Sequence, residues 1–399
     1  MGRKRQRFKK NFDGYQSANQ LLDGLESQAL EVERRARADN RVVTLADLTR
    51  VLKIQDTTSD ARTIEEWSAK FLEHKLEQGA KPGTMRSHRA THAHLTKFAK
   101  LRKLSALNTL TEDVFDAFFK HLRSLRNYHP NTFTGIAKNI EVFLNYATSK
   151  GAVLCDPRPK VRRPYSSTKR DFLTFTEFKQ LRNFTELQFL EWRNLHEPLK
   201  DRFTKSRLPR FDVAERVCDS FCFACMTGLR FSDLHRLTKS HYSCTEFGPS
   251  IKFMPLKTNS FKAKRAKELT IGLIPEAVAI IEKYAAETTT TLLPVLAAPH
   301  YNRYIKYITE AVGIVEPVEV LRYQNGVPFT EQVPKYETVS SHMARHTFAT
   351  LSRIFGLDLA DLRDMLGHSD LRTTAIYDHL ANDYKARKQV HVWTEAMKL

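Results

Sequence analysis

Apolar residues recur three and four positions apart in four segments between about residues 63 and 152, the pattern of amphipathic helices. The segments run from Trp67 to Leu76, from about Thr84 to Leu101, from the cap Thr111 to Leu122, and from Pro130 to Tyr146. Glycine and proline at positions 79 to 83 separate the first from the second. Because such helices bury their apolar faces against one another, we expect a compact helical bundle.

The pattern changes in the second half of the chain. Val213 to Leu229 is apolar on most of a helical surface and predicts a buried helix that Gly228 brings to an end. Two strand-like runs follow, Ile251 to Leu256 and Glu268 to Leu273, around a basic turn, and they predict a hairpin. This half should therefore combine helices with a small sheet.

Three further helices are predicted near the C-terminus. The first begins at the caps Ser340 and Ser341, and we expect its packed side to carry Phe348, Leu351 and Ile354. It stops at Gly356. A short helix from Leu359 to Leu366 ends at Gly367, and Ser369 is expected to cap a last helix that carries Tyr377.

These patterns divide the chain into four regions. They are a basic tail and helical leader at 1–56, a helical core-binding domain at 57–153, a basic linker at 154–171 and a catalytic domain at 172–399, whose tail begins near 383. In the leader, Leu21 to Val32 and Leu45 to Leu52 have helical spacing. Trp192 to Arg210 is charged and is interpreted as a surface insertion.

The charge balance indicates the partner. Lysine and arginine outnumber the acids by 64 to 45, for a formal charge of +19. A polyanion such as DNA or RNA fits this surface, although a basic protein of another kind has the same composition. The residues expected to contact DNA lie around the second helix and in the linker, and they are Lys81, Arg86, Arg89, Lys97, Arg162 and Arg163.

No signal peptide and no membrane span of about 20 apolar residues is visible, so we expect a cytoplasmic protein without a membrane partner. The five cysteines are Cys155, Cys218, Cys222, Cys225 and Cys244. An odd number in a chain of this type predicts reduced thiols. Three of them have iron-sulfur-like spacing, but offsets of four and seven place them on one apolar helix face, so we expect a packing role and no metal.

Several polar residues stand where helices or strands stop. Arg230 follows Gly228, with Asp233 three residues later, and Lys257 ends the first predicted strand. His342 and Arg345 lie three residues apart at the start of a helix.

His368 follows Gly367, and Tyr377 comes nine residues after it. Each of these residues has an ordinary structural explanation, as an ion pair, an exposed lysine, a core histidine or a half-buried aromatic. Together, two arginines, a lysine, two histidines and a tyrosine are the groups that a metal-free phosphoryl transfer to tyrosine needs.

The motifs TGLRFSDL, the lysine of LKTN, HMARHTFAT and LGHSDLRTTAIYDHL resemble those of tyrosine recombinases in order and spacing. The resemblance covers most of Phe172 to Leu380, and the bundle before it resembles that family's SAM-like core-binding domain. It implies a mostly α fold in which this helical domain and a mixed α/β catalytic domain with a small antiparallel sheet form a C-shaped clamp on DNA. FSDL and ARHTFAT resemble integrases of Bacteroidetes-type mobile elements.

The resemblance also implies roles for the polar residues. Arg230 and Arg345 would clamp the scissile phosphate, His368 would add a hydrogen bond, and Asp233 would orient this cluster. Asp233 stands where many relatives have glutamate, which keeps the charge but shortens the reach.

Tyr377 would be the nucleophile, with His342 as its proton acceptor and Lys257 as the acid that protonates the departing 5' oxygen. The implied reaction passes through a 3'-phosphotyrosyl intermediate and a Holliday junction, without metal, ATP or other cofactor. The partners would be double-stranded DNA with specific recombination sites and accessory DNA-bending proteins. The protein would be nucleoid-associated, a homotetramer on DNA and a monomer or weak self-associate without it. Its amphipathic tail would either dock on a neighbouring protomer or pack on its own domain.

Other functions share this chemistry or this fold. A chromosome-dimer resolvase, an invertase or a telomere resolvase would have the same active-site residues. A type IB topoisomerase would use a tyrosine without a tetramer, and a DNA-binding regulator could keep the fold without catalysis. The short leader leaves recognition of accessory arm sites open.

Overall fold

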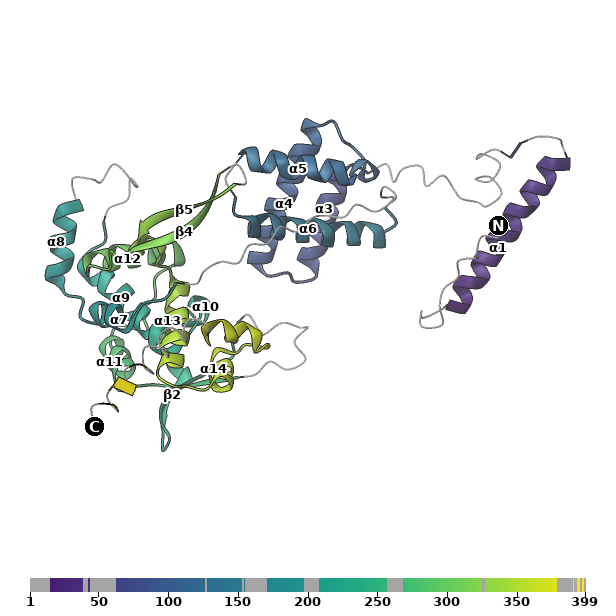
Figure 1. The fold of residues 1–399 in the computed structure, drawn as a ribbon. Coiled ribbons are helices and arrows are strands. Elements are labelled where there is room, and N and C mark those ends of the chain that lie inside the picture. The colour runs from purple at the N-terminus through teal and green to yellow at the C-terminus, as the bar shows by residue number, and fades with distance from the viewer. Residues whose placement is uncertain are drawn as a thin grey trace. The chain divides into compact units, whose positions relative to one another are not determined.

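The computed structural model describes residues 15–38, 42–43, 62–125, 128–152, 154, 171–196, 208–256, 268–324, 327–378, 390, 393–394 and 397. The chain divides into two compact units (Figure 1). The first holds Met1–Ser167 with Tyr323–Phe329, and the second holds Thr168–Arg322 with Thr330–Leu399. Within the described residues, no helix is both long and apolar enough to span a membrane.

The first unit is helical. The leader forms α1 (Tyr15–Ala38), which confirms the helix predicted around Leu21 to Val32, whereas the stretch at 45–52 lies outside the described residues. The four predicted bundle helices are also present: α3 (Ile64–Glu77), α4 (Pro82–Leu101), α5 (Glu112–Leu125) and α6 (Pro130–Ser149).

Large aromatic side chains fill the bundle. Five of them expose at most 1% of their surface to solvent: Trp67, Phe71, Phe98, Phe118 and Phe143. A fully buried side chain of this size stabilises the fold by roughly 1.5–3 kcal/mol relative to exposure. The helical spacing of these residues is therefore what brings the four helices together.

The second unit contains the remaining helices. They are α7 (Phe175–Arg182), α8 (Glu186–His196), α9 (Phe211–Thr227), α10 (Phe231–Leu234), α11 (Pro275–Tyr284), α12 (Ala298–Ala311), α13 (Ser341–Ile354), α14 (Leu359–Leu366) and a last helical stretch at 372–378. Helices α7, α8, α11, α12 and α13 pack against α9. The predicted apolar helix is thus the centre of this unit.

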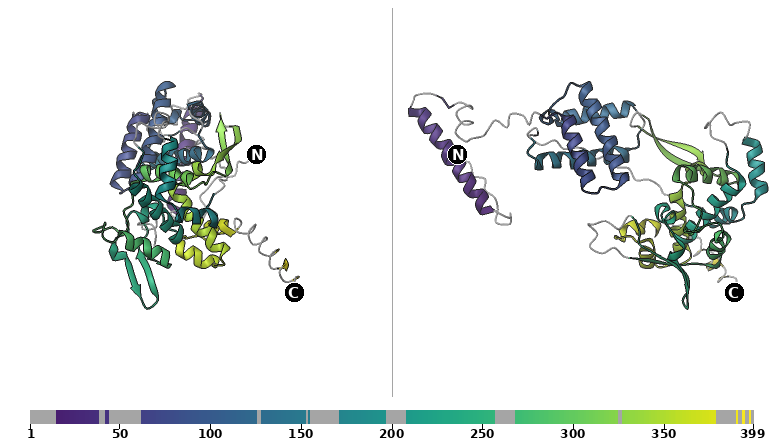
Figure 2. Two further views of the ribbon diagram at one scale, coloured as in Figure 1. Left: turned by 90° about the vertical axis from the view of Figure 1, so that its left-hand side faces the viewer. Right: turned by 180° about the vertical axis from the view of Figure 1, so that it is seen from behind.

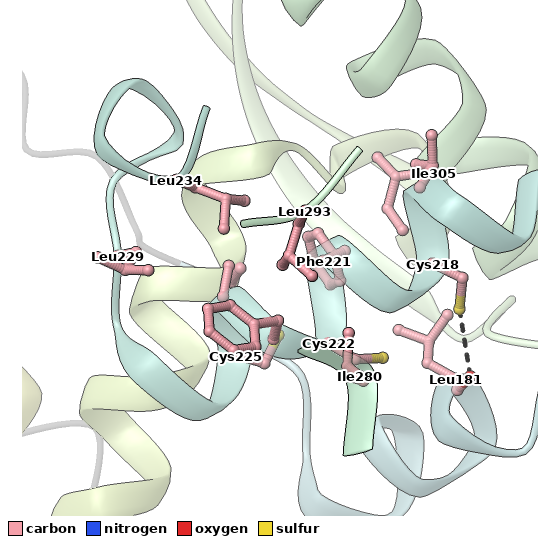
Figure 3. Close-up of a cluster of buried hydrophobic side chains, with 14 of the residues drawn as sticks. Leu181, Cys218, Phe221, Cys222, Cys225, Leu229, Leu234, Ile280, Leu293 and Ile305 are labelled. Carbon is pink, nitrogen blue, oxygen red and sulfur yellow. Dashed lines mark hydrogen bonds between the residues drawn. The ribbon is translucent and has the colours of Figure 1, made fainter. Parts of the chain in front are cut away.

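The cysteines of α9 belong to that core. Figure 3 shows Cys218, Cys222 and Cys225 among leucine, isoleucine and phenylalanine side chains. Cys218 donates to the carbonyl oxygen of Leu181 at 3.3 Å, and burial raises the pKa of Cys225 well above its ordinary value. All three thiols are buried in the hydrophobic core around α9, so their predicted packing role is confirmed.

The small sheet has three antiparallel strands, β1 (Tyr242–Thr245), β2 (Gly248–Phe253) and β3 (Leu269–Gly272). The predicted pairing of the last two is confirmed, with Ile251 opposite Ile271. Strand β1 was not predicted, since it is only four residues long and none of its side chains is buried. The β1–β2 hairpin, drawn in teal, projects from the unit in both views of Figure 2.

A second sheet pairs β4 (Pro317–Gln324) with β5 (Val327–Pro334) and was also not predicted. Most of its side chains are exposed or half-buried, with only Val333 fully buried. This hairpin was missed although Val318 and Val320 flank Glu319 and an Asn-Gly dipeptide, typical of two-residue hairpin turns, stands at 325–326 in the sequence.

The predicted surface insertion from Trp192 to Arg210 was wrong at its start. Helix α8 continues to His196, and Trp192 is buried and stacks on Tyr307 with 5.0 Å between ring centroids. The indole nitrogen of Trp192 donates to Glu310 at 2.8 Å. Residues 197–207 lie outside the described part, as do Arg162 and Arg163 of the linker and most of the tail.

Candidate active site

Gly228 creates the turn that presents Arg230. It ends α9 in the left-handed conformation with φ of 67°, where side-chain-bearing residues are strained. A Cβ added to it would stand 2.4 Å from Cδ1 of Phe348, closer than any real contact. Both the conformation and the space therefore require glycine at this position.

Arg230 occupies the N-cap position of α10 with 16% of its side chain exposed. Its Nη1 lies 4.0 Å from Oδ2 of Asp233 and is a buried nitrogen without a hydrogen-bond partner. Burial lowers the pKa of Arg230, and Asp233 opposes that effect. A buried donor of this kind is ready to bind an anion.

Asp233 is 2% exposed and links two elements of the site. Its Oδ1 accepts a hydrogen bond from the backbone N–H of Leu256 at 2.9 Å, and Arg236 lies 3.6 Å away. Leu256 directly precedes Lys257, which lies outside the described residues. Asp233 therefore holds the end of the chain segment that carries the predicted acid.

Arg345 is 3% exposed and is held by backbone carbonyls at the ends of two helices. It donates to the oxygen of Gly228 at 2.8 Å, after α9, and to that of Leu366 at 2.5 Å, in the last turn of α14. Helix C-termini carry partial negative charge and stabilise a cation. These contacts compensate part of the cost of burying the guanidinium.

The compensation is incomplete. Burial, with the charge of Arg230 as a second cause, lowers the pKa of Arg345 to about 9, while Tyr377 and Asp233 act in the opposite direction. A buried guanidinium whose charge is disfavoured by a second guanidinium forms, together with it, a strong site for an anion.

His368 completes the cationic side of the site. It follows Gly367, which ends α14 with φ of 60° and whose added Cβ would lie 2.9 Å from Leu269. Its Nε2 lies 3.0 Å from Nη2 of Arg345 and its Nδ1 lies 2.9 Å from Oγ1 of Thr374. Because arginine can only donate, Nε2 accepts, and Nδ1 carries the proton that is shared with Thr374.

Tyr377 is 1% exposed. It is therefore more buried than expected if it were an ordinary half-buried aromatic residue with a purely structural role. It packs in a small core with Phe348, Leu362 and Leu366. The expectation that Ser369 caps its helix was wrong, since Asp370 accepts from the backbone N–H of Arg372 at 2.9 Å.

The phenol oxygen of Tyr377 contacts a histidine that sequence interpretation missed. Nδ1 of His346 lies 2.8 Å from Oη of Tyr377, and His346 is 8% exposed. His342, the predicted proton acceptor, is exposed, and its ring meets that of His346 edge-on with 4.6 Å between centroids. The spacing of four residues, which places both rings on one helix face, was the available signal.

Helix α13 is more completely enclosed than expected. The side chains of residues 343–351 are all buried, so Arg345 and Phe348 do not lie on a polar and a packed side as predicted. Ser340 is at the N-cap but makes no capping bond through its side chain. Instead, Asn302 of α12 accepts from the backbone N–H of Ser341 at 2.7 Å.

Four of the residues expected to contact DNA are exposed on or beside α4: Lys81, Arg86, Arg89 and Lys97. Spacings of three and eight residues place the last three on one face of the helix. Their contact with DNA stays a prediction.

Comparison with known proteins agrees with this geometry. Residues 63–163 match the phage integrase SAM-like domain and residues 210–383 match the phage integrase family. A tyrosine recombinase XerD of Lacticaseibacillus casei is 25% identical over 294 residues, which cover 73% of this chain and 86% of the relative.

Two solved structures share the fold. A lambda integrase dimer bound to a COC' core site has a TM-score of 0.53 at 14% identity, over 79% of this chain and 95% of the other. The Tn1549 transposon integrase in complex with transposon right end DNA has a TM-score of 0.51 at 13% identity, over 82% and 99%. The chain thus belongs to the phage integrase family and is a tyrosine recombinase, an enzyme of site-specific DNA strand exchange.

Proposed function

We propose that this recombinase integrates and excises a mobile element by cutting and rejoining double-stranded DNA through a covalent bond to Tyr377. The observation that carries the proposal is the buried pair of Arg230 and Arg345 beside the tyrosine. Arg230 has a partnerless buried nitrogen, and each arginine has a pKa lowered by burial. A scissile phosphate supplies the negative charge that both guanidinium groups need.

Hydrogen-bond donors remain for such a phosphate. The three contacts of Arg345 use two N–H groups of Nη2 and one of Nη1, and a guanidinium has five N–H groups. Arg230 adds its buried Nη1. Donors fixed before the reaction stabilise charge that develops on the phosphate in the transition state.

In the proposed cleavage step, Oη of Tyr377 attacks the phosphorus and a histidine of α13 accepts the phenolic proton. A P–O bond forms to the tyrosine while the bond to the 5' oxygen breaks. Lys257 gives a proton to that oxygen, which leaves as a hydroxyl. The products are a 3'-phosphotyrosyl enzyme and a 5' hydroxyl end, and the reverse reaction with a new 5' hydroxyl rejoins the DNA.

Two further residues support this step. Asp233 holds the backbone of Leu256, the residue that precedes the proposed acid Lys257 in the sequence. His368, fixed by Thr374, lies against Nη2 of Arg345, and Nε2 would donate to the same phosphate once it is protonated and turned from Arg345 to the anion.

The wording of FSDL and ARHTFAT, which resembles integrases of Bacteroidetes-type elements, favours integration over the resolution of chromosome dimers. We propose that four protomers assemble on paired recombination sites with accessory DNA-bending proteins, in the cytoplasm at the nucleoid. The Tn1549 relative, a transposon integrase, is consistent with a mobile element.

The test uses nicked duplexes that tile the DNA flanking the gene for this chain, incubated with the protein in chelator. A nick near the cleavage site releases a short fragment, so the covalent complex is trapped and survives detergent. Tyr377→Phe is the decisive variant, and Tyr301→Phe, an equally buried tyrosine in α12, is the matched control.

A covalent band from the wild type and Tyr301→Phe that is missing from Tyr377→Phe would support the proposal. Sequence-specific binding without any adduct from the wild type would point to a regulator. Efficient deletion between two sites on one plasmid, without joining of sites on separate molecules, would favour a resolvase over an integrase.

A further inference from the structure

His346 is the partner of the nucleophile's hydroxyl. Its Nδ1 lies 2.8 Å from Oη of Tyr377, and the two side chains come from segments 31 residues apart. Both are buried, at 8% and 1% exposure. Little water reaches this hydrogen bond and competes with it, because both groups are buried. The bond therefore fixes the position of the phenolic proton.

The geometry separates the two histidines of α13. His346 makes the hydrogen bond to the phenol, whereas His342 is exposed and contacts His346 through the edge of its ring. His346 also directly follows Arg345, so one turn of helix presents both a phosphate-binding guanidinium and an imidazole to Tyr377.

The alternative explanation is structural, because a buried tyrosine needs a hydrogen-bond partner wherever it lies. Two features favour chemistry. The partner is an imidazole, whose ordinary pKa near ~6.5 suits proton transfer at neutral pH. The contact also lies at the oxygen that must lose its proton in order to attack.

We propose that His346 is the general base that accepts the proton of Tyr377 during cleavage. The inference rests on the proposed role of Tyr377 as the nucleophile. As the bond from Oη to phosphorus forms, the phenolic proton moves to Nδ1 and leaves an imidazolium. In the ligation step the proton returns to Oη as the phosphotyrosyl bond breaks.

His346→Asn tests the assignment. The amide oxygen of asparagine can accept the phenolic hydrogen bond near the place of Nδ1, but it has no useful basicity. His342→Asn, one helical turn earlier, tests the competing assignment, in which the exposed histidine of the pair is the base. Single-turnover formation of the covalent complex on a nicked duplex cleaved by the wild type gives the rate, and filter binding of the same duplex gives its affinity.

We expect His346→Asn to slow covalent-complex formation by about 10²–10⁴-fold at neutral pH with little change in affinity. Raising the pH should recover rate, because hydroxide then ionises the phenol in place of the base. A 5'-bridging sulfur at the scissile phosphate, which leaves without an acid, should not rescue His346→Asn but should rescue Lys257→Ala.

The pH profile has to be interpreted with the neighbouring groups in mind. His342 from α13 and Tyr377 from the last helical stretch face the His346 ring, and the charges of Arg230 and Arg345 act on the same phenol. The wild type therefore serves as the reference for each variant at every pH.

The proposal is wrong if His346→Asn keeps the wild-type rate and pH profile, or if His342→Asn alone shows the loss and its recovery at high pH. If circular dichroism shows that His346→Asn is unfolded, the pH profile of covalent-complex formation is measured instead on protein that keeps His346 and carries a fluorinated tyrosine at position 377. Transfer to a histidine predicts an acid-side inflection that does not move with the phenol's pKa, and an inflection that moves with it would overturn the assignment. Absence of any adduct from the wild type would instead reject the proposed function.

Discussion

Arg353, near the end of α13, binds the carboxylate of Asp378, the residue that follows Tyr377. Its Nε and Nη2 lie 2.7 and 2.5 Å from Oδ1 of Asp378, with 13% and 31% of the two side chains exposed. Arg353 also donates to the carbonyl oxygen of Leu357. The helix that supplies Arg345 and His346 is thus joined directly to the segment that supplies the nucleophile.

We expect Asp378→Asn to weaken this connection and slow covalent-complex formation by about tenfold, because a partly buried charge-assisted hydrogen bond is worth roughly 1–3 kcal/mol. Duplex affinity should not change. Asp364→Asn removes an exposed ion pair with Arg363 and is the matched control. Equal rates for both variants in single-turnover cleavage would show that the ion pair between Arg353 and Asp378 does not position Tyr377.

Gly228→Ala should destabilise the second unit by more than the left-handed conformation alone requires. The conformational strain is about 1–2 kcal/mol, and the new Cβ would also meet the Phe348 ring at 2.4 Å. Because the oxygen of Gly228 binds Arg345, cleavage should fall as well. Gly313→Ala is the control, since its φ of 82° is strained but nothing lies within 4 Å. Urea unfolding that gives the same loss for both variants would contradict the steric argument.

The helical bundle of the first unit, α3 to α6, should lose stability as the pH falls below about 6.5. Burial lowers the pKa of His92 to about 4, with a smaller effect from His88, and the ring lies 5.1 Å from Phe71 and 4.7 Å from Phe143. The folded state therefore binds the proton less tightly than the unfolded state. The stabilisation is complete above about pH 6.5 and is lost as the pH falls toward 4, by about 3 kcal/mol in all.

Hydrogen exchange of amides in α3 to α6, measured between pH 7 and pH 4 and corrected for the intrinsic rate, checks this dependence. His92→Phe keeps an aromatic ring between two phenylalanines and should remove the contribution of His92 to the pH dependence, leaving that of His88, whose pKa is also lowered by burial. A His92→Phe protein with the full wild-type pH dependence would show that another group is responsible.

The exposed face of α4 should contribute to DNA affinity through phosphates. Replacing both Arg86 and Arg89 by alanine should reduce the slope of log affinity against log salt by about 2, close to 0.9 for each phosphate that the protein no longer neutralises. Lys100→Ala is the control, since this lysine is paired with Glu65 at 2.7 Å. Fluorescence anisotropy over a range of salt gives the slopes, and an unchanged slope for the double variant would exclude this face from the DNA interface.

Local signals in the sequence determined most of the helices. Apolar spacing located the four bundle helices and α9, and Gly228 and Gly367 marked helix ends because the backbone there must be left-handed. These two glycines also indicated Arg230 and His368 as candidate site residues, because a residue that follows a helix end lies in a turn. The β4–β5 hairpin was missed although its Asn-Gly dipeptide at 325–326 is a local turn signal, and its mostly exposed side chains give only a weak apolar pattern on either side.

Tertiary packing decided which of these residues meet. The sequence put His342 and His346 on one face of α13, but the docking of the segment at 372–378 selects His346 as the partner of Tyr377. Arg345 is likewise held by the carbonyls of Gly228 and Leu366, which lie 117 and 21 residues away. The sequence determines which residues share a helix face, because the helical repeat of 3.6 residues is a local property. Contacts between distant segments depend instead on how the side chains pack together in the core.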